Sequence, residues 1–353
     1  ADLLHSCPGR PAHHSARFHV TCEFMIKKVC DNIFCFPITL PRSPLKYLNC
    51  YVIKSGSGKN LLIDTGYALL ESRRDLEAGI QELELTPENT DVFLTHIHAD
   101  HTGNAAYLAK FGYHIIMGER DYHGVIEAHS PDFYGARQKS IDAGVPADVL
   151  DAIFVHNPSP IMLPEMFPAE TVKAGDVLEY GGHRLECLPT YGHSPGHISL
   201  YDREHEIIFL GDHVLFDISP NIVLWTWADD ALGEYLKSLL AVQELSVKTA
   251  LPAHRTAGSI PLAARAEELI NHHQRRIEEL SAIVRGWPGL TCYEVAARMK
   301  WSIRAASWDD FPPSQKYFAV CECMAHLQHM CCSGLAERRT DANSVMRYYA
   351  KGK

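Results

Sequence analysis

Short apolar runs alternate with amphipathic stretches along most of this chain. Apolar runs of roughly four to eight residues between turn residues are typical of buried strands, and apolar residues about three or four positions apart are typical of helices. The runs predict strands at residues 26–30, 33–39, 47–54, 61–63, 91–95, 114–117, 176–180, 183–188, 198–201, 207–210 and 249–251. Helical spacing predicts helices at 67–85, 103–110, 228–246 and 262–285. This alternation predicts an α/β fold with layered sheets.

The strongest chemical feature is the stretch 95–104, which reads THIHADHTGN. His96 and His98 lie two positions apart after a predicted strand, so their side chains point to the same side of extended backbone. Asp100 and His101 are adjacent at the turn into a helix and can reach a neighbouring point. Imidazole and carboxylate ligands together suit zinc, iron or manganese. The stretch therefore predicts a site able to serve two metal ions.

Other residues of ligand type also follow predicted strands. Asp64 follows the strand at 61–63, and His193 lies in a Gly/Pro loop after the strand at 183–188. Asp212 and His254 follow two later strands. Because each of these residues comes just after a strand, we expect them to gather at one edge of the sheets.

The pattern resembles the metallo-β-lactamase superfamily over roughly residues 26–260. His96-X-His98-X-Asp100-His101 matches its motif, and the later ligands follow in the family's order. The resemblance implies an αββα sandwich with a dinuclear site between the sheets. It also implies the role of each residue: His96, His98 and His193 for one metal, Asp100, His101 and His254 for the other, Asp212 bridging both, and Asp64 orienting the ligands from outside.

Hydrolysis is the chemistry that the resemblance implies. A bound divalent metal lowers the pKa of water from about 15.7 to about 7, so a bridging hydroxide would attack the substrate at neutral pH. Asp212, Asp100 and Asp64 are the candidate catalytic carboxylates. Zinc is the favoured metal for both positions, with iron or manganese as alternatives. His197 and His213 adjoin the expected ligands and are interpreted as structural neighbours.

Local sequences narrow the substrate class. Residues 192–196 and 63–66 are similar to those of glyoxalase II-like and lactonase-like hydrolases, and Asp212 stands where the commonest zinc β-lactamases have cysteine. The favoured function is therefore hydrolysis of a small thioester, lactone or other ester. A phosphodiesterase or nuclease with the same dimetal site is the alternative, and a non-catalytic interaction role is a second. The net charge of −10 disfavours broad attraction to nucleic acid.

The pocket is expected in the segments between the ligands. The apolar residues of the helical insertion at 118–170 either pack in the core or form a lid or pocket wall, and the loop at 217–227 is expected to shape the pocket as well. Phe133, Met166, Phe167 and Trp225 would make the pocket apolar, and Tyr122, Tyr191 and Trp225 are candidate proton donors.

Three segments are expected. Residues 1–24 lack periodicity and an apolar signal-peptide core, which predicts an N-terminal extension, either added sequence or a genuine arm. Residues 25–261 form the expected catalytic domain. Residues 262–353 contain three helices, one opened by a capping box at 291–294, and a hairpin in the tail. This last segment resembles the winged-helix tail of some metallo-β-lactamase-fold proteins.

Composition bears on location and partners. The 353 residues are 46% hydrophobic, enough for two domains with a sizeable core. No apolar run approaches the roughly 18 residues of a membrane span. The eleven cysteines favour free thiols in a reducing cytoplasm over a disulfide framework. Apolar residues in the tail predict packing against the catalytic domain or in a homodimer. Packing is also preferred to metal binding for Cys321, Cys323, Cys331, Cys332, His326 and His329.

Overall fold

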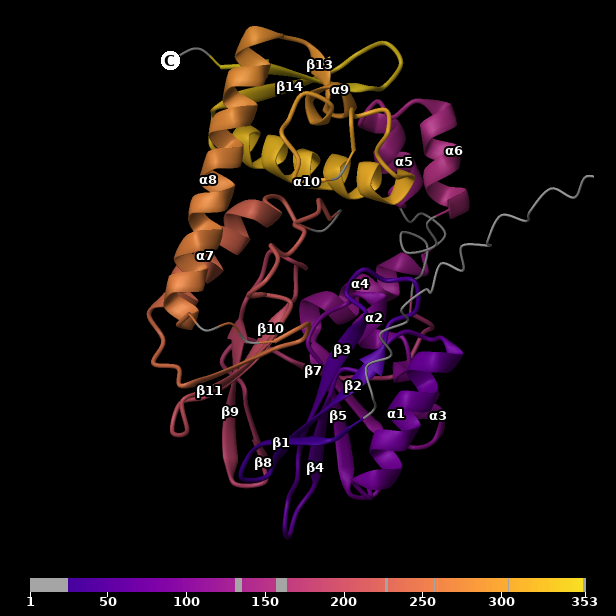
Figure 1. The fold of residues 1–353 in the computed structure, drawn as a ribbon, viewed down its shortest axis with the longest axis vertical. Helices are drawn as coiled ribbons and strands as arrows, with labels where there is room; N and C mark the ends of the chain where they lie inside the picture. Colours follow the sequence, from indigo (N-terminus) through magenta and orange to yellow (C-terminus); the bar gives the residue numbers. More distant parts are fainter. Residues whose placement is uncertain are drawn as a thin grey trace, which may run out of the picture.

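The structure is a computed structural model and describes residues 25–130, 135–156, 164–225, 228–256, 258, 260–303 and 305–351. The extension predicted at 1–24 lies outside this range. Two facing β-sheets form the centre of the molecule (Figure 1). Within the described residues, no helix is both long and apolar enough to cross a membrane.

In the described part of the chain the first sheet has seven strands, in the order β1-β2-β3-β4-β5-β6-β7. Neighbouring strands are antiparallel from β1 to β4 and parallel from β4 to β7. The strands are β1 Lys27–Cys30, β2 Ile33–Thr39, β3 Tyr47–Ile53, β4 Asn60–Ile63, β5 Thr90–Leu94, β6 His114–Gly118 and β7 Glu170–Val172. The parallel strands bring the ends of β4 and β5 to the same edge.

The second sheet has five strands among the described residues, in the order β12-β11-β10-β9-β8. These are β8 Val177–Tyr180, β9 His183–Pro189, β10 Ile198–Asp202, β11 Ile207–Gly211 and β12 Thr249–Pro252. Gly181 and Gly182 join β8 to β9 with φ of 57° and 87°. A two-residue hairpin with positive φ at both positions matches the twist of its strands, which is why two glycines serve here.

Apolar side chains hold the sheets together. Phe93 and Ile116 of the first sheet share a buried cluster with Leu200 and Phe209 of the second. The rings of Tyr51 and Phe209 meet edge to face with centroids 5.6 Å apart. Strands buried on both faces have continuous apolar sequences, and this pattern allowed them to be predicted.

Helices cover the outer face of each sheet. The first sheet is covered by α1 Leu70–Glu82, α3 Ala105–Lys110 and α4 Glu119–Ala128, and the short α2 Ala99–Thr102 follows β5. The second sheet is covered by α7 Ala231–Gln243 and α8 Leu262–Gly286. The molecule is thus an αββα sandwich, as predicted.

The C-terminal part packs as a separate layer above α7 (Figure 1). It contains α9 Cys292–Ala296, α10 Pro313–Cys332 and a small sheet of β13 Leu290–Thr291, β14 Ala336–Thr340 and β15 Met346–Ala350 in the order β13-β15-β14. The predicted tail hairpin is β14 and β15. The predicted capping box forms, because Thr291 Oγ1 accepts from the backbone of Glu294 while the Glu294 carboxylate accepts from the backbone of Thr291.

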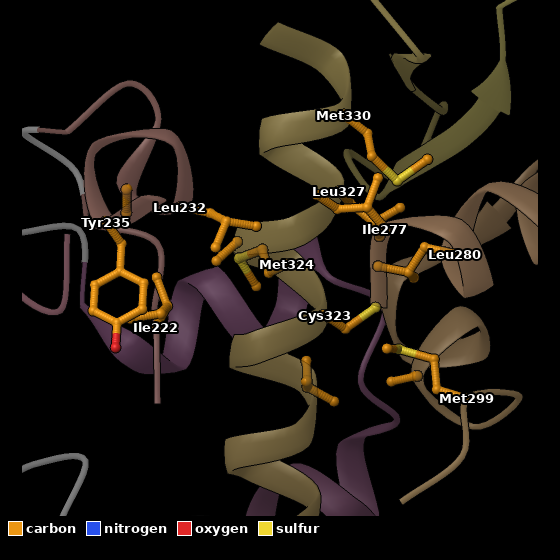
Figure 2. Close-up of a cluster of buried hydrophobic side chains, with 14 of the residues drawn as sticks. Ile222, Leu232, Tyr235, Ile277, Leu280, Met299, Cys323, Met324, Leu327 and Met330 are labelled. Atoms are coloured by element: carbon orange, nitrogen blue, oxygen red, sulfur yellow. The ribbon is translucent and has the colours of Figure 1, made fainter. Parts of the chain in front are cut away.

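One apolar cluster joins this layer to the sandwich. Figure 2 shows Leu232 and Tyr235 of α7 on one side of α10, beside Met324, with Ile277 and Leu280 of α8 on the other side. The same cluster includes buried side chains of the second sheet. The C-terminal layer therefore shares its core with the sandwich.

Helix α8 runs along both layers (Figure 1). Near its start, Arg265 donates to the backbone carbonyls of Leu215 and Ile218, in the loop after β11. Further along, His273 Nδ1 lies 3.0 Å from His326 Nε2 of α10. These two positions of α8 are thus fixed to different parts of the molecule.

The segment predicted as a helical insertion contacts two different regions. α4 packs on β6 and β7, whereas α5 Ala136–Asp142 and α6 Ala147–His156 lie beside α10 (Figure 1). The backbone N–H of Tyr293 in α9 also donates to the carbonyl of Ala143.

The helix predicted at 103–110 begins two residues later, at Ala105, as α3. The chain forms α2 before Gly103 and α3 after Asn104. A Cβ at Gly103 would lie 2.4 Å from the backbone nitrogen of Ala68, so the chain passes too closely for any other residue. The Asn104 amide donates to the carbonyls of Thr65 and Tyr67, which fixes the break.

Candidate metal centre

The predicted ligands come from both sheets and meet at one edge. His96 and His98 follow β5, and Asp100 and His101 lie in α2. Loops after β9, β11 and β12 supply the other three, which are His193, Asp212 and His254. All seven are among the groups of side chains whose ligand atoms lie within 4.8 Å of one another.

Three imidazoles form one half of the cluster. His96, His98 and His193 make up one such group. His96 Nε2 and His98 Nδ1 are 2.9 Å apart, and His98 is only half-buried while the other two are buried. This arrangement suits a metal ion held by neutral nitrogen ligands with one side towards substrate.

Carboxylates mark the other half. Asp100, His101 and His254 form a second group. His254 Nε2 lies 3.4 Å from Asp100 Oδ2, and His101 Nε2 lies 4.0 Å from Asp100 Oδ1. The Asp212 carboxylate lies between the halves, 3.3 Å from His254, 3.6 Å from His101 and 3.6 Å from His193. It therefore lies within ion-pair distance of imidazoles from both groups.

Four buried polar atoms converge here without a hydrogen-bond partner in the described part of the chain. They are His101 Nε2, His193 Nε2, His254 Nε2 and Asp212 Oδ1. A buried polar atom left unpaired typically costs about 1–3 kcal/mol, so four in one place need an explanation. Divalent cations supply it, because imidazole nitrogen and carboxylate oxygen are their ordinary ligands. The residues present therefore fit a metal pair.

Outer contacts orient the imidazoles. The Nδ1 atoms of His101, His193 and His254 face Asp64 Oδ2 at 2.8 Å, the carbonyl of Asn221 at 2.9 Å and the carbonyl of Tyr47 at 3.1 Å. Each Nδ1–H donates outward, which places the Nε2 lone pair towards the cluster.

Burial keeps the imidazoles neutral in the half of the cluster formed by His96, His98 and His193. It lowers the pKa of His96 well below the ordinary value, and the imidazoles of His101 and His98 lower it further. Burial also lowers the pKa of His193 to about 3. These imidazoles are neutral at neutral pH, and each has one unprotonated nitrogen available as a ligand.

The other half concentrates negative charge. Burial acts to lower the pKa of His101, but Asp64, Asp212 and Asp100 outweigh it and hold that pKa well above the ordinary value. Burial acts to raise the pKa of Asp212, but His254 and His101 hold it well below its usual range. The carboxylates thus remain ionised and draw positive charge to this half, whether proton or metal ion.

Asp121 was not identified from the sequence. This fully buried carboxylate in α4 accepts hydrogen bonds from the backbone of Ile97 and Gly196 and from the Ser194 hydroxyl. It therefore joins the loop of His96 to the loop of His193. Burial raises its pKa to about 6. Its place shortly after the strand β6 was the one available clue.

His197 and His213 occupy different surroundings. His197 Nδ1 faces the Thr190 hydroxyl at 2.7 Å, and its Nε2 accepts from the backbone N–H of Asp212 at 3.1 Å. It therefore holds the backbone of Asp212 in place. His213 packs against Tyr235, and burial lowers its pKa to about 3.

The residues that were expected to line an apolar pocket lie in different parts of the structure. The Trp225 ring lies over His98 with centroids 5.6 Å apart, at the cluster. Phe167 instead is buried in the core behind the first sheet, and Met166 is exposed. The Tyr122 hydroxyl donates to the carbonyl of Phe167, so its proton is committed away from the cluster. Phe133 lies outside the described residues.

The fold and its cluster define a sandwich of the metallohydrolase type. The sequence model of the metallo-beta-lactamase superfamily matches residues 45–254, more than half of the chain. The chain belongs to this superfamily, which confirms the predicted family and its enzyme class, a hydrolase.

Three curated relatives give the comparison more detail. A lactamase-like protein of Emericella nidulans is 26% identical over 72% of this chain and 69% of its own length. An atrochrysone carboxyl ACP thioesterase of Aspergillus fumigatus is 24% identical over 66% of this chain, and the match spans only 58% of that protein. An acyl-coenzyme A thioesterase of Gallus gallus is 27% identical over 58% of this chain and 72% of its own length.

A solved structure matches nearly the whole molecule. A metallo-beta-lactamase family protein from Thermus thermophilus superposes with a TM-score of 0.76 and 27% identity. The match covers 92% of this chain and 100% of that one. The C-terminal layer is therefore part of an arrangement found in another member.

Proposed function

We propose that this protein is a dinuclear metal-dependent hydrolase of thioesters. The observation that carries the proposal is the convergence, around Asp212, of four buried ligand atoms that form no hydrogen bond in the part of the chain that the structure describes. Support for the substrate class comes from the two relatives that are named as thioesterases, one for acyl carrier protein and one for coenzyme A.

In this proposal, His96, His98 and His193 hold one ion, and Asp100, His101 and His254 hold the other, with Asp212 between them. Divalent ions bound there would supply a water molecule ionised near neutral pH and Lewis acidity at the carbonyl oxygen. The outer partners Asp64, Asn221 and Tyr47 keep the imidazoles aimed inward.

Trp225 forms an apolar wall beside the half-buried His98. Its indole Nε1 donates to the carbonyl of His193 at 3.4 Å. The loop that carries it is tied to the helical layer, because Asn221 Nδ2 donates to the carbonyl of Phe318 and Lys139 Nζ donates to the carbonyl of Leu224. An ordered apolar wall suits the carbon chain of an acyl group better than a phosphate.

The nuclease alternative has less support. Three basic residues of the tail already have partners: Arg338 donates to Gln328, Arg339 pairs with Glu337, and Arg347 pairs with Asp341. These three guanidinium groups are thus already engaged within the protein rather than presented together to a phosphate backbone. The tail instead packs by its apolar side, with Tyr348 buried.

A substrate panel with metal analysis tests the proposal. Purified protein is assayed by mass spectrometry for bound metals and then against acyl thioesters, lactones, simple esters and phosphodiesters. We expect two divalent ions per chain and the highest kcat/KM on thioesters, lost on chelation and restored by zinc, iron or manganese. A metal-loaded protein that cleaves only phosphodiesters would favour the nuclease, and one inactive on the whole panel would favour a non-catalytic role.

A further inference from the structure

A hollow of about 200 Å³ lies outside the cluster of ligands, and two of its lining residues, Tyr47 and Arg255, are direct neighbours of His254. His254 connects the two, because its Nδ1 donates to the carbonyl of Tyr47 and Arg255 follows it in the chain. The hollow is lined by Leu45, Lys46, Tyr47, Asp217, Arg255 and Thr256. These residues come from the β2–β3 loop and from the loops after β11 and β12.

Two cationic side chains of this hollow form no ion pair with any residue that the structure describes. Neither Lys46 Nζ nor the Arg255 guanidinium has a hydrogen bond or an ion pair with any residue that the structure describes. Arg255 Nε is also fully shielded from solvent and unpaired among these residues. Asp217 shares the rim but lies beyond ion-pair distance of both cations in the described structure. A buried donor without an acceptor indicates a group that a ligand completes.

Both cations are carried on left-handed backbone. Lys46 has φ of 70° and Arg255 has φ of 61°. Residues other than glycine rarely adopt this conformation, and it persists only where the surroundings impose it, often at ligand sites. Here the Lys46 carbonyl accepts from Leu40, and the Arg255 carbonyl accepts from the Asn49 amide. The side chains are therefore aimed by a backbone that is held in place.

We propose that this hollow binds a carboxylate carried by the substrate a few bonds from the scissile carbonyl. The inference rests on the proposed thioester hydrolysis. The guanidinium fork of Arg255 matches a carboxylate in two hydrogen bonds, and Lys46 adds a second charge. In a protein of net charge −10, a hollow whose lining carries two cations and one carboxylate, a net charge of +1, favours anionic substrates. Leu45 and Tyr47 give the intervening carbons an apolar surface.

Because the hollow is close to His254, only certain positions in the substrate can carry the anionic group that it binds. A phosphate at the far end of a pantetheine arm lies many bonds from the thioester and does not reach a hollow one imidazole away from the metal ligands. The carboxylate belongs either to the acyl group or to the thiol next to the sulfur. Both positions would present the same group, a carboxylate, and matched substrates distinguish between them.

Three thioesters make the comparison: butyryl-N-acetylcysteamine is neutral, succinyl-N-acetylcysteamine carries a carboxylate on the acyl side, and butyryl-N-acetylcysteine carries one on the thiol side. We expect at least one charged substrate to have the higher kcat/KM, mainly through a lower KM. Arg255→Gln removes that advantage by about ten- to a hundredfold, since charged hydrogen bonds are worth this factor. Lys46→Gln reduces it less.

Arg42→Gln is the matched control. Arg42 lies in the same loop as Lys46 and has φ of 62°, but it does not line the hollow. Arg255→Gly distinguishes a binding role of Arg255 from a structural one. Because glycine tolerates positive φ, this variant should keep or raise Tm. It should nevertheless lose the preference for the charged substrate. A merely structural arginine would instead lower Tm on this change.

Equal kcat/KM for charged and neutral substrates, or a preference that survives Arg255→Gln, overturns the inference. If no thioester is hydrolysed, the proposed function fails and a binding measurement decides the subsite separately. Succinate must then raise the Tm of the wild type and of Arg42→Gln but not that of Arg255→Gln. An equal shift in all three proteins would also overturn it.

Discussion

Asp64 and His101 form a buried pair in which the carboxylate accepts from imidazole Nδ1 at 2.8 Å. The other carboxylate oxygen of Asp64 accepts from the backbone N–H of Thr95 at 2.9 Å. One side chain thereby fixes both the tautomer of His101 and the start of the loop that carries His96. The motif at 95–104 owes its geometry to a residue that lies 31 positions before Thr95 in the chain.

Replacing Asp64 with asparagine should weaken metal binding without unfolding the protein. The amide cannot accept from both partners as the carboxylate does, so His101 loses its orientation. Loss of such an outer partner typically lowers metal affinity by about 10- to 100-fold. Competition with a chromogenic chelator measures the affinity. Asp75→Asn is the control, because Asp75 is also buried but accepts from Thr39 behind the first sheet. Equal affinity in wild type and Asp64→Asn would contradict this role.

Asp212→Ala should reduce turnover by about a thousandfold or more, because the bridge contributes several kcal/mol of charge stabilisation. Metal analysis should show fewer than two ions per chain. The steady-state rate on the best thioester, measured at saturating metal, checks the effect. Unchanged metal content together with unchanged turnover would exclude a bridging role for Asp212.

Asp121 should make stability depend on pH in a defined direction. Its folded pKa of about 6 exceeds the ordinary value of 3.8, so its contribution is fully present below about pH 4 and is lost as pH rises through 6. The difference between the two pKa values corresponds to about 3 kcal/mol. Urea unfolding of metal-free wild type and Asp121→Asn from pH 4 to 7 measures it. The free energy of unfolding of the variant, relative to that of wild type, should rise by about 3 kcal/mol between pH 4 and pH 7. A difference in the free energy of unfolding that stays constant over this range would refute the assignment.

Leu327→Ala should destabilise the sandwich and the C-terminal layer together. Leu327 is fully buried in the cluster that joins them, and such truncations typically cost about 2–5 kcal/mol. Near-UV circular dichroism and metal release should follow one transition, at a lower midpoint than in wild type. Leu240→Ala is the control, because that leucine is half exposed on α7. Two separate transitions would mean that the layers fold independently.

The local parts of the fold and site could be predicted from sequence, and the relations across the chain mostly could not. Buried strands and the metal-ligand residues that follow them could be predicted, because each apolar run lies next to its ligand residues in the sequence. The capping box at Thr291 was likewise local and formed as expected. By contrast, Asp121 acts through backbone N–H groups of two distant loops, and no sequence pattern records a backbone donor.

Side-chain direction was the second limit. Met166 and Phe167 are neighbours, yet one is 47% exposed and the other 2%. Composition alone assigned both to the pocket, and it could not show that Phe167 turns into the core. Arg255 escaped notice for a similar reason, because its left-handed backbone and unpaired guanidinium emerge only when three loops of the described chain meet.

Helix α8 sets the separation between the two layers. Each residue advances an α-helix by about 100° and 1.5 Å, so inserting or deleting one residue between Arg265 and His273 would turn one attachment about 100° away from the other. Arg265 would leave the loop after β11, or His273 would leave α10. The spacing within this helix is therefore constrained as strictly as the spacing of the metal ligands, although α8 supplies none of them.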